Sequence, residues 1–125
     1  MSYIPEHSFR ITQTSTTAPT ALDIVNTLPN EVTVAYTYTG VGVYKATYTG
    51  LARFGVAASN VVIPPTWQAG NATHNQKATF TVAAVGATIE VTITTTQAPV
   101  ANPNTFVAAD AVLSALPVTI RFVAG

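Results

Sequence analysis

Three side chains in one polar segment are the best candidates for chemistry in this chain. Residues 64–76 form the longest polar stretch and contain Trp67, Asn71 and His74, and Trp67 is the only tryptophan. A tryptophan ring can stack on a sugar ring, while neighbouring amide and hydroxyl groups hydrogen-bond the sugar hydroxyls. We therefore predict that these residues form a ligand or interface site, with carbohydrate as the candidate ligand. The alternative is that Trp67 closes one end of the fold or packs against a neighbouring subunit.

Catalytic and metal chemistry find little support in the other residues. His7 and His74 lie far apart, neither stands at a metal-ligand spacing, and the chain has no cysteine. A histidine–aspartate–serine set could be assembled from His74, Asp110 and a serine, but no motif selects it. The glycines of residues 40–42 precede an expected strand, whereas a phosphate loop precedes a helix. We expect no enzymatic activity, no metal and no cofactor.

Charge is scarce and scattered along the chain. The 125 residues include five basic and five acidic side chains, and the net charge is zero. Nucleic-acid binding depends on clustered lysine and arginine, so we expect no nucleic-acid partner. Residues 1–7 lack the basic start and apolar stretch of a signal peptide, and no stretch reaches the roughly 18 apolar residues of a membrane span. We expect neither a secretion signal nor a membrane segment.

Threonine takes the place of charge on one face of the expected strands. The chain contains 22 threonines, and in residues 32–39 and 88–94 they alternate with apolar and aromatic side chains. Alternation with a period of two indicates strands with one buried and one outward face. The expected buried residues of these two runs are Val32, Val34, Tyr36, Tyr38, Ile89, Val91 and Ile93.

The same pattern, interrupted by glycine and proline, predicts seven or eight strands in an all-β fold. Hairpin turns are expected at residues 39–42 and at Gly86, and a short helical turn is expected within residues 107–116. Strands at this spacing indicate an antiparallel β-sandwich or a jelly-roll-like barrel. The expected strands are residues 8–14, 21–26, 32–39, 43–49, 60–63, 77–85, 87–96 and 117–123.

The shortage of charge also predicts self-assembly. A neutral surface tends to associate, and strands without edge lysines lack the usual protection against pairing with other chains. We therefore expect a homo-oligomer whose surfaces and strand edges are covered by other subunits. The alternative is a monomer that threonine hydroxyls and asparagine amides keep soluble.

Residues 26–28 (Asn-Thr-Leu) and 40–50 together form the run N-T-L … G-x-G-x-Y-x-x-T-x-x-G. This run resembles one found in small β-rich structural proteins of tailed bacteriophages, namely virion proteins and fibre tips. Residues 110–121 are similar to the closing strand of such domains. The resemblance implies a non-enzymatic virion component, a capsid decoration, cement or small fibre protein. It further implies a homo-oligomer, often a trimer, in contact with other virion proteins such as the major capsid protein.

The expected organisation is a single β-sandwich domain over residues 21–125. Residues 1–20 are expected to form an N-terminal extension that contains the first strand, and residues 1–5 are a candidate anchor because a terminal strand can add to a partner sheet. The alternative function is a carbohydrate- or host-receptor-binding module that uses Trp67, Asn71 and His74 toward a host-surface glycan.

Overall fold

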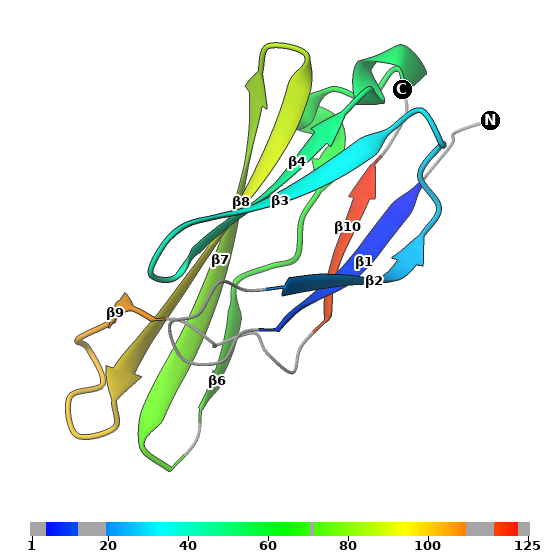
Figure 1. Ribbon diagram of the computed structural model, residues 1–125. Coiled ribbons are helices and arrows are strands. Elements are labelled where there is room, and N and C mark those ends of the chain that lie inside the picture. Colours follow the sequence, from blue (N-terminus) through cyan, green and yellow to red (C-terminus); the bar gives the residue numbers. More distant parts are fainter. Residues whose placement is uncertain (1–4, 13–19, 71, 110–116, 123–125) are drawn as a thin grey trace.

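The computed structural model describes residues 5–12, 20–70, 72–109 and 117–122. Ten strands and two short 3₁₀-helices follow one another along this part of the chain (Figure 1). They are β1 (Glu6–Thr12), β2 (Thr20–Asn26), β3 (Thr33–Gly40), β4 (Val43–Thr49), η1 (Leu51–Phe54), η2 (Ala58–Asn60), β5 (Val61–Val62), β6 (Trp67–Gly70), β7 (His74–Val85), β8 (Thr88–Pro99), β9 (Val107–Ala108) and β10 (Pro117–Phe122).

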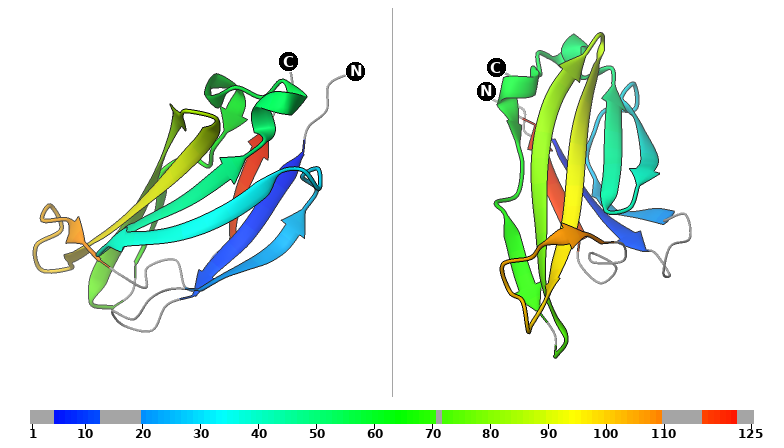
Figure 2. Two further views of the ribbon diagram at one scale, coloured as in Figure 1. Left: turned by 45° about the horizontal axis from the view of Figure 1, so that its top comes forward. Right: turned by 90° about the vertical axis from the view of Figure 1, so that its left-hand side faces the viewer.

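The strands form two antiparallel sheets that pack on each other as a β-sandwich (Figure 2). The smaller sheet has the order β2-β1-β10-β5, and the larger sheet has the order β3-β4-β8-β7-β6. The short strand β9 adds to β8 beyond the end of β4. The predicted all-β sandwich is confirmed, and the tertiary pairings supply the strand order that the alternation left open.

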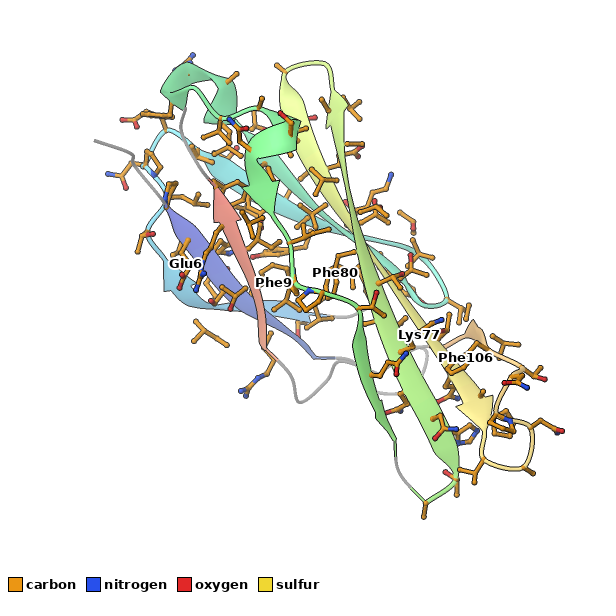
Figure 3. All side chains as sticks on the ribbon, turned by 180° about the vertical axis from the view of Figure 1, so that it is seen from behind. Glu6, Phe9, Lys77, Phe80 and Phe106 are labelled. Atoms are coloured by element: carbon orange, nitrogen blue, oxygen red, sulfur yellow. The ribbon has the colours of Figure 1, made fainter. Side chains whose placement is uncertain are left out.

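The core between the sheets is built from most of the alternating rows that the sequence predicted. Tyr36 of β3, which was expected to be buried, is instead 38% exposed. Phe9 and Ile11 of β1 are buried, and Figure 3 shows Phe9 and Phe80 between the two sheets. Tyr48 meets Phe122 of the opposite sheet edge-on, with 4.8 Å between ring centroids. The other buried rows are Tyr44 and Ala46 of β4, Ile89, Val91 and Ile93 of β8, and Val118 and Ile120 of β10.

Both predicted hairpin turns are present, and one of them is held tightly. Gly42 and Gly86 have φ angles of +70° and +59°, which glycine adopts more easily than any other residue. Gly42 also packs against β8, because its carbonyl accepts the Thr95 N–H at 2.8 Å. A Cβ atom at Gly42 would lie 2.4 Å from the Thr95 carbonyl oxygen, whereas one at Gly86 would meet nothing within 4 Å.

The prediction of a polar loop over residues 64–76 is wrong, because most of this segment is a β-hairpin. Strand β6 occupies Trp67–Gly70 and pairs with β7, which already begins at His74. The residues of this hairpin are too polar to show a strand period in sequence. Their intrinsic preference for the strand conformation is weak, but backbone hydrogen bonds to a neighbouring strand are enough to hold them in it.

Two further boundaries differ from those expected. The start of the expected helical segment is the strand β9, which pairs with Thr96 and Gln97 of β8, while residues 110–116 lie outside the described part. Strand β1 lies between β2 and β10, so the sandwich includes residues that were expected in an N-terminal extension. Of the candidate anchor, residues 1–4 are not among the described residues.

Candidate functional site

Two of the three predicted ligand residues, Trp67 and His74, are on the strands β6 and β7, and their backbones lie far apart along β7. Trp67 pairs through its backbone with Ala78, four positions along β7 from His74, which corresponds to about 14 Å along the strand. The Nδ1 atom of His74 lies 3.0 Å from the Thr73 hydroxyl. Asn71 and the side chain of Trp67 lie outside the described part of the chain.

A hollow lies at the same end of the larger sheet. Gln68, Asn75, Gln76 and Phe106 line a space of about 420 Å³. The Phe106 side chain is 37% exposed, and the Lys77 ammonium lies 4.8 Å from its ring centroid (Figure 3). Amide groups beside an accessible aromatic ring are the groups that carbohydrate recognition requires. His74, the one predicted residue whose side chain the structure describes, is not among the residues that line the hollow.

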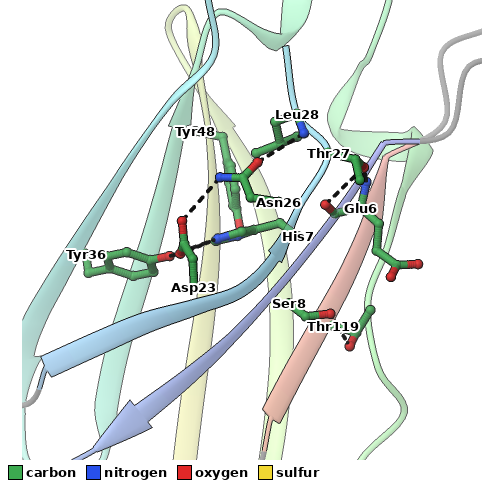
Figure 4. A network of polar contacts seen from close by, with 10 residues as sticks. All are labelled: Glu6, His7, Ser8, Asp23, Asn26, Thr27, Leu28, Tyr36, Tyr48 and Thr119. Atoms are coloured by element: carbon green, nitrogen blue, oxygen red, sulfur yellow. Dashed lines mark hydrogen bonds and ion pairs between the residues drawn. The ribbon is translucent and has the colours of Figure 1, made fainter. Parts of the chain in front are cut away.

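A buried histidine that the sequence did not single out joins the two sheets through polar contacts (Figure 4). His7 of β1 is fully buried, and its two ring nitrogens lie 2.8 Å from Asp23 Oδ1 of β2 and 2.7 Å from Tyr48 Oη of β4. The Tyr36 hydroxyl of β3 donates to the same Asp23 oxygen at 2.7 Å. We call His7, Asp23, Tyr36 and Tyr48 the His7 cluster. It takes one residue from each of the first four strands.

An irregularity in β2 places the carboxylate of the cluster. The pairing of β1 with β2 shifts between Ser8 and Phe9, so that Ile24 is an extra residue on β2. In a regular strand, residues three apart point to opposite faces, but a bulge between them brings both to the same face. Asn26 can therefore reach Asp23, and its Nδ2 donates to Asp23 Oδ2 at 3.2 Å.

Hydrogen bonding and burial shift the pKa values of Asp23, Tyr36 and Tyr48. Partial burial opposes ionisation of Asp23, but hydrogen bonds from His7, Tyr36 and Asn26 outweigh it and hold its pKa below the ordinary value of 3.8. Burial, together with the Asp23 charge, raises the pKa of both Tyr36 and Tyr48. An ionised Asp23 can only accept, so His7 donates from Nε2. In the neutral ring Nδ1 then accepts the Tyr48 proton, and every member has a partner.

This arrangement suits a structural role better than a catalytic one. His7 is inaccessible to solvent and both of its ring nitrogens are engaged, so it offers no free base to a substrate. The sequence did indicate the position of His7. Phe9 and Ile11 alternate on the inward face of the expected strand, and two residues before Phe9 the same alternation places His7 on that face. No pattern in the sequence indicated that Asp23, Tyr36 and Tyr48 would be the residues around it.

The outward face of the larger sheet is nearly uncharged. Strands β3, β4, β8 and β7 stand side by side, and their outward residues lie in register across the sheet. The charged side chains of this face are Lys45 and Glu90, which pair with each other at 3.6 Å, and Lys77 at one end of β7, whose ammonium lies over the Phe106 ring. We call this surface the threonine face, and its threonines are Thr33, Thr37, Thr47, Thr49, Thr79, Thr81, Thr88, Thr92 and Thr94.

Searches for other kinds of site and for related proteins were negative. Within the described residues, no group of three or more histidine, aspartate or glutamate side chains is placed to hold a metal ion. The same part of the chain has no helix long and apolar enough to cross a bilayer. No protein-family model matches the chain, and neither a curated protein nor a solved structure matches it.

Proposed function

We propose that the protein is a non-enzymatic structural component that self-associates, and that it serves on the surface of a phage particle. The threonine face carries this proposal. Nine threonines from four strands form a broad surface on which Lys45 and Glu90 neutralise each other and Lys77, at one end, is the remaining charge. Such a surface presents methyl groups and hydroxyls without repulsion between copies, and low net charge favours association. The virion assignment itself rests on the resemblance of residues 26–28 and 40–50 to phage structural proteins.

The molar mass of the purified full chain in solution tests self-association. Light scattering over a wide concentration range should give a mass above the 13.0 kDa of one chain. A mass of one chain at the highest concentration would contradict the proposal. Antibody labelling of purified phage particles from the source of the chain tests the virion assignment separately, and absence of the chain from those particles would contradict it.

A second candidate function is carbohydrate binding, which the hollow at Phe106 favours. The ring and the amides of Gln68, Asn75 and Gln76 could contact a sugar ring and its hydroxyls. Titration with a panel of neutral hexose oligosaccharides, followed by amide chemical shifts, should perturb residues around the hollow, and Phe106→Ala should abolish the effect. Unchanged shifts across the panel would remove this candidate without affecting the first.

A further inference from the structure

The four edges of the two sheets are protected unequally. In the smaller sheet, the edge strand β2 carries the charged Asp23, and β5 has only two residues and is soon followed by Pro64 and Pro65. In the larger sheet, β6 has only four residues and pairs with residues 75–78 of β7. The rest of β7 pairs with β8 alone, and η2 packs against β7. Short length, charge and proline are the usual means by which proteins prevent edge strands from pairing with other chains.

The remaining edge, β3, has none of these protections. Its eight residues, TVAYTYTG, include no charged residue and no proline. Within the described part of the chain β3 has one neighbour in the sheet, β4. Thr33, Ala35 and Thr37 are exposed on its outward face, and Tyr36 is 38% exposed on the other. An edge of this length and composition is a template for a further strand.

We propose that β3 pairs antiparallel with β3 of a second copy of this chain, about a twofold axis, to give a dimer. The inference rests on the proposed self-association and names the surface responsible for it. Twofold pairing brings each strand against its own copy, so a charged edge would meet a like charge. Strand β3 brings only uncharged residues together: threonine, valine, alanine, tyrosine and glycine. The antiparallel order of the larger sheet then continues across the axis.

The edge is already held in the conformation that pairing needs. The Tyr36 hydroxyl is fixed by Asp23 of the opposite sheet, and hydrogen bonds to β4 extend along β3 from Thr33 to Gly40. An edge that is ordered before association loses little conformational entropy on binding. In an antiparallel pair about half the residues of each strand direct their N–H and C=O groups at the partner.

Two lysine substitutions in one row of the larger sheet test the proposal. Ala35 of β3, Thr47 of β4, Glu90 of β8 and Ala83 of β7 lie in register, and both alanines are exposed. Ala35→Lys places a charge at the proposed axis, and Ala83→Lys makes the same change on the same face, three strands away. We expect wild type to have twice the mass of one chain. Ala35→Lys should raise the dimer dissociation constant at least about tenfold, and Ala83→Lys should change it less than about threefold.

The outcomes separate this inference from the proposed function. A wild-type mass of one chain contradicts both. A trimer, or a dimer that Ala35→Lys leaves intact, overturns β3 pairing and leaves self-association standing. Dissociation by Ala83→Lys alone would overturn β3 pairing and assign the contact to the threonine face or to the edge of β7 beyond β6.

Hydrogen exchange of the unmodified protein provides a test that does not depend on a variant folding. Amide protection along β3 should rise with protein concentration, as the mass does, while protection along the edge strand β2 should not. Protection of β3 that is the same in monomer and oligomer would overturn the inference.

Discussion

Replacing the two buried partners of the His7 cluster, singly and together, measures what the cluster contributes to stability. Tyr48→Phe removes the hydroxyl that lies 2.7 Å from His7 Nδ1, and His7→Phe removes the ring that this hydroxyl contacts. Tyr48→Phe leaves His7 Nδ1 without its partner, and His7→Phe leaves the Tyr48 hydroxyl without its partner. Water cannot replace either partner, because both side chains are fully buried. The double change removes both atoms and leaves two aromatic rings in contact.

The size of the effect follows from burial. An unsatisfied buried donor or acceptor costs about 1–3 kcal/mol, whereas replacing both partners by apolar groups of similar shape can be nearly neutral. We expect each single variant to lose about 1–3 kcal/mol of unfolding free energy. The double variant should lose no more than the worse single one, so the coupling free energy should be at least about 1 kcal/mol. Asp23, the other partner of His7, has a side chain that is 46% exposed and can turn to water.

Urea unfolding followed by circular dichroism provides the measurement, with the slope of the transition checked for constancy across variants. Tyr36→Phe is the control, because its hydroxyl contacts the part-exposed Asp23, and it should cost less than about 1 kcal/mol. Additive losses within about 0.5 kcal/mol would refute the reasoning, since they would show that the two side chains act independently.

Three further predictions concern pH and the turns. The folded pKa of Asp23 lies below 3.8, so its stabilisation is present above that pH and is lost as pH falls toward the folded value; urea unfolding should show this loss, and Asp23→Asn should remove it. The pKa values of Tyr36 and Tyr48 are raised in the folded state, so below pH 10 both tyrosines are protonated in the folded and the unfolded chain alike. Above pH 10 only the unfolded chain ionises them, so the free energy of unfolding should decline and tyrosinate absorbance should rise on unfolding. Gly86→Ala should cost about 1–2 kcal/mol from its positive φ alone. Gly42→Ala should cost about 1–3 kcal/mol more, because its Cβ meets the Thr95 carbonyl, and equal thermal shifts for the two variants would contradict this.

The alternation of side chains was enough to predict the sandwich. The period of a strand depends only on which neighbouring residues in the sequence are apolar, so it can be recognised without knowing the tertiary structure. The row of Tyr44, Ala46 and Tyr48 is buried as predicted, and so is the row of Ile89, Val91 and Ile93. Turns at glycine followed from the backbone freedom of that residue. Strand β6 and the first three residues of β7 escaped detection, because they carry no hydrophobic period and are held in place by pairing with each other and with β8.

Sequence alone therefore determined the fold class, the inward rows and the scarcity of charge. Only the tertiary structure decided which strands lie at the edges, that β3 is the least protected of them, and that His7 meets Asp23, Tyr36 and Tyr48. These contacts join residues up to 41 positions apart and depend on a one-residue bulge in β2. Periodicity reports which face of a strand is buried, but it carries no information about which strand lies next to it.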